Sequence, residues 1–316
     1  MQSISRRGFV ISAATAAAAF GLDGPLEFIT PAFAQKAPGD VAKFKVGDIE
    51  VMQMFDGVWE KAHDEKFIKN ASLDETKAAL KAAGLTDAHV PITFTVTAVK
   101  LKNGNIVLFD SGTGAQLAPT AGLITKNDHW KKAGIDPAKV KTIVITHFHG
   151  DHITGLMAKD TNAPIFPNAE IFVPAVEYKY WTDPAVTAGA AKRIQAVFPG
   201  WKNIKQFDGD KEVVPGVRAV ATPGHTRGHT SYQLSSGNRR LYVLGDVTNI
   251  QALNVKNPGW HLAFDADAAL AEANRRKIMD RAISENAILT GYHWGMPGAG
   301  TIKKDGKGYA LVPVKA

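Results

Sequence analysis

Four side chains of kinds that commonly bind metal ions lie within six residues of one another in this 316-residue chain. They are His147, His149, Asp151 and His152, in the run His-Phe-His-Gly-Asp-His. Gly150 inside the run permits a backbone conformation that bulkier residues resist, so the loop can fold back and present its ligands to two ions. Surface histidines rarely cluster in this way, and the run therefore predicts a dinuclear metal site.

Three more candidate ligands each follow an apolar segment farther along the chain: His225, Asp246 and His293. The chain contains no cysteine, so any metal ion must be bound by nitrogen and oxygen atoms. Together with the run, these residues supply enough ligands for two coordination spheres. A lone histidine is more often a core or surface residue, which is our interpretation of His63, His89, His129 and His261.

The segments around these ligands predict a mixture of strands and helices. Val140–Thr146 is a continuous apolar, β-branched run, as expected for a strand buried on both faces, and it ends where the histidines begin. Ser72–Ala83 has helical periodicity, with Ser72 and Glu75 as a capping box. Strands and helices alternate to the end of the chain, which indicates an α/β fold. Further strands are expected at Phe44–Met54, Ile92–Leu101, Ile106–Phe109, Ala169–Val173, Val217–Ala221, Thr230–Leu234, Leu241–Leu244 and Ile288–Thr290, and a second long helix at Ala266–Ser284.

The N-terminal segment predicts an export signal and not a part of the fold. Arg6 and Arg7 precede a weakly apolar, alanine-rich run, Ile11–Phe20, and Ala32-Phe33-Ala34 is a small-residue cleavage pattern. We therefore expect a signal peptide at 1–34 that the twin-arginine export machinery recognises, and one catalytic domain at 35–316. The apolar run is shorter than the ~20 residues that span a bilayer, so no stable membrane insertion is expected. The mature protein is expected to be periplasmic or secreted.

Replacing Arg6 and Arg7 by lysine is expected to trap an active, uncleaved precursor in the cytoplasm. The reason is that the arginine pair serves as an address and contributes nothing to the metal site. Cell fractionation with immunoblotting, on the wild type and the double variant, measures this. Normal periplasmic delivery of the variant would contradict the prediction.

The formal net charge of +7 does not by itself indicate a nucleic-acid partner. The lysines are scattered along the chain and never form a dense basic run, so we interpret the charge as mainly promoting solubility. A small-molecule substrate and no nucleic acid are expected.

The seven candidate ligands match the pattern His-x-His-x-Asp-His, a distant histidine, an aspartate and a final histidine. The chain therefore resembles the metallo-β-lactamase superfamily. The resemblance implies an αββα sandwich, with two central mixed sheets flanked by helices and a dinuclear metal site at the sheet edge. It also implies that His147, His149 and His225 bind one ion, that Asp151, His152 and His293 bind the other, and that Asp246 bridges them. Two divalent ions are expected, zinc first, with manganese, iron or cobalt also compatible with nitrogen and oxygen ligands.

The resemblance assigns supporting roles as well. Asp110 matches an aspartate that members of the superfamily place behind the ligands, and His229 resembles a structural partner of the site that is not itself a ligand. The substrate pocket is expected in the insertion between the histidine run and His225. Trp181 is the favoured pocket residue among the aromatic side chains of this insertion, which are Tyr178, Tyr180, Trp181 and Phe198.

A metal centre of this kind is suited to hydrolysis. Water bound to zinc has its pKa lowered from about 15.7 to about 7, so a hydroxide that bridges two ions can attack near neutral pH. Asp151 and Asp246 are the catalytic candidates because either could relay a proton after the attack. Within the superfamily, the chain resembles exported methyl parathion hydrolase-like enzymes, over stretches such as Ile145–Met157 and Val214–Thr230. This similarity implies hydrolysis of small phosphotriesters, aryl esters or lactones.

Other activities stay open. A quorum-quenching lactonase of acyl-homoserine lactones comes first among them, although the tyrosine that these enzymes place three residues after the bridging aspartate is Asn249 here. A zinc β-lactamase is a less favoured alternative, because these enzymes generally lack an aspartate at the position of Asp246. A glyoxalase II-like thioesterase is also less favoured, because those enzymes carry an additional helical domain. A single-iron persulfide dioxygenase is a further alternative. The sequence is also compatible with a homodimer.

Overall fold

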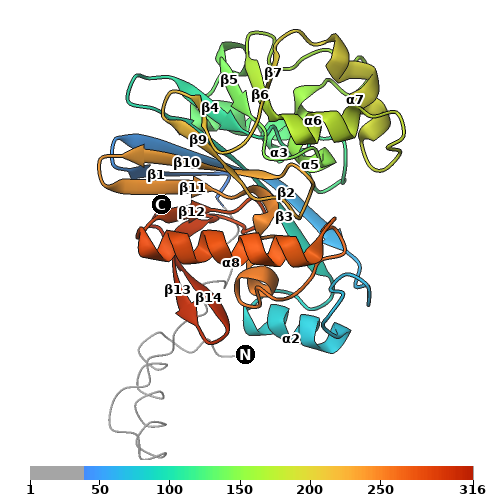
Figure 1. Ribbon diagram of the computed structural model, residues 1–316, viewed down its shortest axis with the longest axis vertical. Coiled ribbons are helices and arrows are strands. Elements are labelled where there is room, and N and C mark those ends of the chain that lie inside the picture. The colour runs from blue at the N-terminus through green and yellow to red at the C-terminus, as the bar shows by residue number, and fades with distance from the viewer. Residues whose placement is uncertain (1–38, 316) are drawn as a thin grey trace, which may run out of the picture. The chain divides into compact units, whose positions relative to one another are not determined.

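Two seven-stranded sheets form the centre of the protein (Figure 1). The computed structural model describes residues 39–315, so the expected signal peptide at 1–34 lies outside the described residues. The first sheet contains its strands in chain order from β1 to β7, and the second runs from β14 back to β8. Each sheet combines parallel and antiparallel pairs.

The first sheet is an antiparallel meander, β1 to β4, followed by three parallel additions. The segment Phe44–Met54 is strand for most of its length, as expected, but Gly47, with φ of 60°, turns the chain and divides the segment between the two strands of a hairpin. The strand expected at Ile106–Phe109 is confirmed. The strands are β1 Val41–Val46, β2 Ile49–Lys61, β3 Val90–Lys100, β4 Ile106–Phe109, β5 Thr142–Val144, β6 Glu170–Pro174 and β7 Ile204–Phe207.

The second sheet is antiparallel except where β11 and β12 pair in parallel. Its last hairpin, β13 and β14, was not predicted, because adjacent exposed lysines, Lys303 and Lys304, interrupt the alternation of a half-buried strand. The strands are β8 Glu212–Val214, β9 Val217–Ala221, β10 Thr230–Ser236, β11 Arg239–Val243, β12 Ile288–Thr290, β13 Ala299–Asp305 and β14 Gly308–Pro313.

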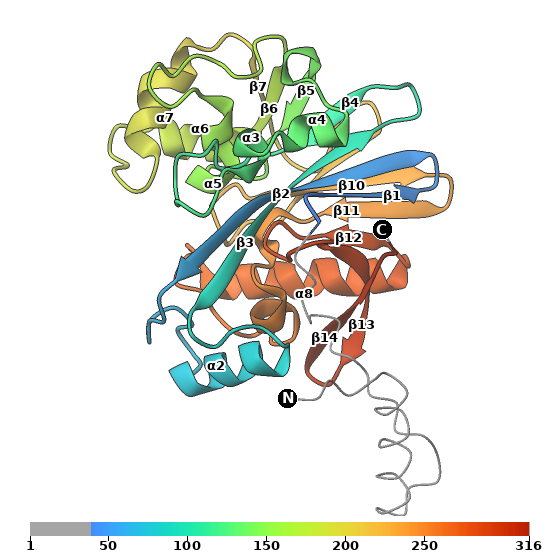
Figure 2. The ribbon, with the colours of Figure 1, turned by 180° about the vertical axis from the view of Figure 1, so that it is seen from behind.

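Helices cover the outer face of each sheet, as the opposite views in Figures 1 and 2 show. The capping box predicted for the first helix is confirmed, since Ser72 and Glu75 bond to each other's backbone amides. Among residues 39–315, no helix combines the length and the apolar character needed to cross a bilayer. The helices are α2 Leu73–Ala82, α3 Leu123–Lys126, α4 His129–Ala133, α5 Gly150–Ile153, α6 Ala175–Thr182, α7 Ala191–Val197 and α8 Ala268–Ser284.

Three apolar clusters fill the spaces between these layers. In β4, Val107 and Phe109 belong to the cluster between the two sheets, whereas Leu108 belongs to the cluster under the helices of the first sheet. A third cluster joins the second sheet to Ile278 and Met279 of α8. The layers are therefore helix, sheet, sheet and helix, and the expected αββα sandwich is confirmed.

Candidate metal centre

The seven candidate ligands converge at one edge of the sandwich. The histidine run begins after β5 and continues into α5, so His147 follows a strand buried between helices and the second sheet. His225 lies in the loop between β9 and β10, Asp246 in a 3-10 turn after β11, and His293 three residues after the end of β12. Each ligand segment thus follows the carboxyl end of a strand, the position where α/β folds commonly place their sites.

Three imidazole nitrogens form the first half of the cluster. Nδ1 of His149 lies 3.0 Å from Nε2 of His147 and 3.0 Å from Nε2 of His225. Ligands about 2.0–2.1 Å from a tetrahedral zinc ion lie roughly 3.4 Å from one another. The three nitrogens are therefore close to the spacing at which they could surround one ion.

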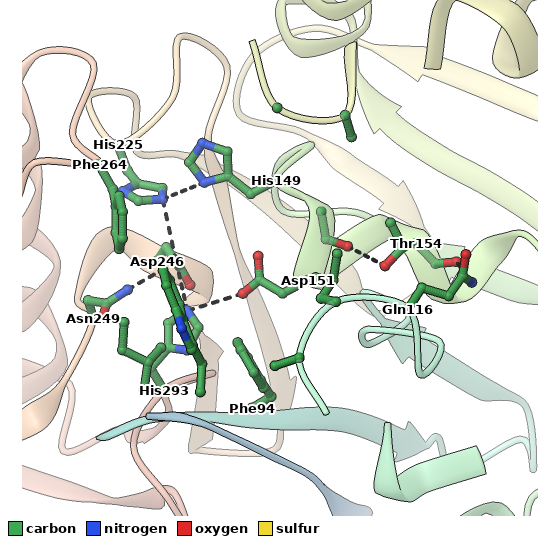
Figure 3. Close-up of a pocket in the computed structure, with 17 residues that line it drawn as sticks. Phe94, Gln116, His149, Asp151, Thr154, His225, Asp246, Asn249, Phe264 and His293 are labelled. Carbon is green, nitrogen blue, oxygen red and sulfur yellow. Dashed lines mark hydrogen bonds and ion pairs between the residues drawn. The ribbon is translucent and has the colours of Figure 1, made fainter. Parts of the chain in front are cut away.

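Asp151, His152 and His293 form the second half. Oδ2 of Asp151 lies 3.4 Å from Nε2 of His152 and 3.6 Å from Nε2 of His293. The Asp246 carboxylate lies between the halves, 2.9 Å from His293 Nε2 on one side and 3.4 Å from His225 Nε2 on the other. Figure 3 shows Asp151, His225 and His293 pointing toward one another, with Asp246 in the middle.

Two buried atoms at the centre of the cluster indicate that these residues fit a metal ion. Nε2 of His152 and Oδ1 of Asp246 lie 3.3 Å apart, yet neither has a hydrogen-bonding partner among the described residues. Leaving a buried polar atom unsatisfied costs about 1–3 kcal/mol. A cation placed between a nitrogen and a carboxylate oxygen satisfies both, so the donor set suits a divalent ion with nitrogen and oxygen ligands.

In four of the histidines, a hydrogen bond at Nδ1 orients Nε2 toward the cluster. Nδ1 of His147 lies 3.0 Å from Oγ1 of Thr146, and Nδ1 of His293 lies 2.7 Å from the carbonyl oxygen of Thr93. Carboxylates hold Nδ1 of His152 and Nδ1 of His225. His149 is the exception, because it presents Nδ1.

Asp110 lies behind His152, at the place the resemblance implied. Its Oδ2 is 2.8 Å from His152 Nδ1, and its carboxylate also accepts hydrogen bonds from the amide and hydroxyl of Thr146. Asp110 adopts φ of 61°, a conformation that costs a non-glycine residue about 1–3 kcal/mol and persists only where its surroundings enforce it. These contacts fix both the carboxylate and the start of the histidine run.

Asp265 holds His225 in the same way, although it was not predicted from the sequence. Its Oδ1 lies 2.9 Å from His225 Nδ1, and its Oδ2 lies 3.3 Å from the fully buried guanidinium of Arg275 in α8. Burial raises the pKa of Asp265, but the His225 hydrogen bond and the Arg275 charge outweigh burial and lower it. Arg275 also donates to the carbonyl of Val247, next to Asp246. No local pattern marks Asp265, because its partners are distant in the chain.

The two halves of the cluster differ in electrostatics. Burial, reinforced by neighbouring histidines, lowers the pKa of His147 well below its usual value and that of His149 to about 3. Burial alone would also lower the pKa of His152 and His293, but the carboxylates of Asp151 and Asp246 outweigh burial and raise both values, His152 well above its usual range. Without a metal ion, protons therefore bind more readily to His152 and His293 than to His147 and His149.

His229 supports Asp246 and does not belong to the ligand groups. The amide of Asp246 donates to Nε2 of His229 at 2.9 Å, and Nδ1 of His229 lies 2.9 Å from Oγ1 of Thr222. Burial lowers the pKa of His229 to about 3, so the ring is neutral and can accept. A Cβ added to Gly245, whose φ is 57°, would lie 2.8 Å from this ring, so glycine is needed for the approach.

Replacing His229 by alanine is expected to lower kcat/KM by ~10–100-fold, because outer partners of metal sites typically contribute that much to affinity or activity. The variant should lose metal more readily and still fold. Steady-state kinetics with metal analysis measures both effects. A loss as complete as that of a ligand variant would contradict this assignment.

The other four histidines lie outside the ligand groups, as interpreted from the sequence. His129 is fully buried, and its Nδ1 lies 2.7 Å from the carbonyl oxygen of Phe55. It is a core residue, so its removal should affect stability. His63, His89 and His261 are half-buried.

A cavity of about 700 Å³ opens over the cluster, a size suited to a small molecule. Five candidate ligands line its base: His149, Asp151, His225, Asp246 and His293. Its apolar walls come from β2, β3 and two loops, and include Trp59, Ile92, Phe94, Leu117 and Phe264.

The expectation that Trp181 lines the pocket is wrong. Trp181 is 5% exposed and packs in the core under α6, edge-on to His149 with ring centroids 5.9 Å apart. The short loop after α6 reaches the cavity instead, through Gly189 and Ala190. The aromatic lining comes from Trp59, Phe94 and Phe264, and it does not include Tyr178, Tyr180 or Phe198.

Parts of the chain are similar in sequence to known proteins. A family model described as the metallo-beta-lactamase superfamily matches residues 95–282, more than half of the chain. An N-acyl homoserine lactonase of Bacillus sp is 31% identical over 147 residues, which are 46% of this chain and 54% of that protein. The N-acyl homoserine lactonase AttM of Agrobacterium fabrum is 35% identical over 124 residues, 37% of this chain and 44% of AttM. The chain thus spans about half the length of the curated relatives it matches.

Two solved structures are similar over most of the chain. AidC, a dizinc quorum-quenching lactonase in complex with a product, N-hexanoyl-L-homoserine, has a TM-score of 0.76 and 25% identity, with 87% of this chain and 98% of AidC covered. The hydrolase AbOPH of the beta-lactamase superfamily has a TM-score of 0.78 and 21% identity, with 88% and 98% covered. The second similarity concerns the fold alone.

Proposed function

Because the chain belongs to the metallo-β-lactamase superfamily, we propose that it is a metal-dependent hydrolase of ester bonds whose preferred substrates are N-acyl homoserine lactones. The observation that carries this proposal is the ligand cluster under an apolar cavity, in a chain whose relatives include N-acyl homoserine lactonases. The resemblance seen in the sequence predicted phosphotriesters and aryl esters ahead of lactones. The relatives favour the reverse order.

The cavity offers what an N-acyl lactone would need. Its base is formed by imidazoles and carboxylates, on which a polar lactone ring could lie. Its walls include the aromatic rings of Trp59, Phe94 and Phe264, and Trp59 stacks on Phe264 with centroids 6.3 Å apart. Apolar side chains around a few convergent polar groups are typical of small-molecule sites, and here they would bury an acyl chain.

We assign one ion to His147, His149 and His225, a second to Asp151, His152 and His293, and the bridging position to Asp246. Two divalent cations, zinc first, would supply a water ligand of lowered pKa and a Lewis acid for the substrate carbonyl. His229 holds the backbone of the bridging Asp246, and the Asp246 side chain is only 4% exposed, so it stays fixed and shielded from bulk water.

Asp151 is the residue to which we assign proton transfer. Its side chain is 19% exposed and lines the cavity, whereas that of Asp246 is 4% exposed. During lactone hydrolysis a new bond forms between a water oxygen and the carbonyl carbon, and the ring carbon–oxygen bond breaks. Asp151 would accept a proton from the water and deliver it to the departing alkoxide, giving the N-acyl homoserine.

A substrate panel tests the proposal on mature enzyme loaded with zinc. We expect kcat/KM for N-hexanoyl homoserine lactone to exceed the values for a paraoxon-type triester and for p-nitrophenyl acetate, with the open hydroxy acid as product. A chromogenic cephalosporin and glutathione persulfide complete the panel. Turnover of either far above the lactone would overturn the substrate assignment.

Hydrolysis of aryl phosphotriesters is a second candidate, and Asn249 is the observation that favours it. Its amide lies 3.3 Å from Asp246 and lines the cavity, at the position where lactonases resembling this chain have a tyrosine. An amide cannot donate a proton to a leaving group as an acid does, so a substrate with a good leaving group is better matched. A triester kcat/KM above that of the lactone would select this candidate.

A further inference from the structure

A buried carboxylate outside the ligand cluster joins the two loops that carry His149 and His225. Glu177 of α6 is fully buried. Its Oε1 accepts a hydrogen bond from the amide of Phe148 at 3.1 Å, and its Oε2 accepts one from the amide of Gly228 at 2.8 Å. Phe148 separates His147 from His149, and Gly228 follows His225 by three residues. One side chain therefore ties together the backbones of three candidate ligands for the same ion.

A third hydrogen bond links Glu177 to Trp181, whose indole packs against the ring of His149. Oε1 of Glu177 also accepts from the indole Nε1 of Trp181 at 3.0 Å, and this indole packs edge-on against His149. All three partners are N–H donors, so the contacts are those of a carboxylate. An amide in its place would turn an NH₂ group toward one of these donors.

Gly228 provides independent evidence that the loop carrying His225 lies close to α6. A Cβ added to Gly228 would lie 2.6 Å from the backbone nitrogen of Glu177 and 3.1 Å from its Cα. Real Cβ atoms essentially never approach another heavy atom so closely. The loop that carries His225 thus lies directly on the backbone of α6, and glycine at this position permits the approach.

The half of the cluster formed by Asp151, His152 and His293 does not depend on the hydrogen bonds of Glu177. His152 is oriented by Asp110, and His293 by the carbonyl of Thr93. None of these residues bonds to Glu177. A change at Glu177 should therefore lower the metal affinity of one ion position more than that of the other.

We infer that Glu177 is a positioning residue that sets the spacing of His147, His149 and His225, and so controls the affinity for the ion these three would bind. The inference rests on the two-ion site of the proposed function. Glu177 touches neither substrate nor metal in this role. It acts through the two loops it holds.

The test is the metal affinity of Glu177→Gln, measured by zinc retention against a graded series of chelator concentrations. We expect one ion to bind ~10–100-fold more weakly, the range typical of outer partners, and the other to bind as in the wild type. Cobalt-substituted His225→Ala and His293→Ala proteins supply reference spectra for the loss of each half. The Glu177→Gln spectrum should match that of His225→Ala.

Two further variants distinguish the effect of the Glu177 hydrogen bonds from a general loss of stability. Gly228→Ala keeps the carboxylate but forces the loop away, and the same selective loss is expected. Trp181→Phe keeps an aromatic ring and both backbone bonds, so a smaller weakening than in Glu177→Gln is expected for the loss of one of the three hydrogen bonds. Glu272 in α8 has a carboxylate that bonds to His261 and Arg276. Glu272→Gln is therefore the matched control and should leave the affinities for both ions unchanged.

Equal weakening of both ions in Glu177→Gln, in proportion to a lower unfolding temperature, would overturn the inference. Unchanged affinities in a folded variant would also overturn it while leaving the proposed function intact. A wild-type protein that binds no metal would overturn both. Should Glu177→Gln fail to fold, unchanged affinities in Gly228→Ala would be decisive against the inference.

Discussion

Asp246→Ala is expected to abolish turnover of N-acyl homoserine lactones, with a loss in kcat/KM well above the ~100-fold upper range for outer partners of a metal site. The reason is that the Asp246 carboxylate contacts both halves of the cluster. It lies 3.3 Å from His152, 3.4 Å from His225 and 2.9 Å from His293. Kinetics and metal analysis of the same samples should show that activity and at least one ion are lost together.

His149→Ala should behave like Asp246→Ala, because it removes a nitrogen placed 3.0 Å from two other ligands. The matched control is His89→Ala, at a half-buried histidine outside the ligand groups, and it should retain near wild-type activity. His129 is not a suitable control because it is fully buried. Similar losses in all three variants would refute the ligand assignment.

Acidification is expected to remove the two ions one after the other, beginning with the ion of Asp151, His152 and His293. Without metal, Asp151 and Asp246 raise the pKa of His152 and His293, so protons compete there as soon as the pH falls below these raised values. Burial lowers the pKa of His147 and His149, the latter to about 3, so protons compete there only in stronger acid. Metal binding releases protons, and affinity therefore falls as pH falls.

Dialysis at stepped pH with metal analysis measures this order. A plateau near one ion per chain on the acidic side of neutrality is expected, and neutralisation with added zinc should restore the second ion and the activity. Loss of both ions in a single step, or retention of only the His293 ion in cobalt spectra, would contradict the prediction.

The parts of the fold that depend on local pattern could be predicted from sequence. The capping box of α2, the bounds of β4 and β9, and the placement of the histidine run after β5 all follow from periodicity and neighbouring residue types. The seven candidate ligands also lie together in space. Their ligand roles and the export signal stay predictions.

The parts that depend on contacts between distant segments could not be predicted. Asp265 meets His225 from 40 residues away, and Glu177 meets Gly228 from 51 residues away. The same limit explains the error at Trp181, because helical spacing shows which residues share a face but not what that face packs against. Trp59 and Phe94 reach the cavity because β2 and β3 extend to the site, a feature of register between strands.

The division of the ligands between the two sheets has a thermodynamic consequence. The segment after β5 supplies His147, His149, Asp151 and His152, whereas the second sheet supplies His225, Asp246 and His293. Neither half of the sandwich can hold a complete coordination sphere alone, so metal would act as a cross-link that only the assembled halves can form. Binding to the folded state alone stabilises it by about 2.7 kcal/mol at a free metal concentration 100 times the Kd. The supply of metal where the chain folds would then govern how much native protein accumulates, as well as how much of it is active.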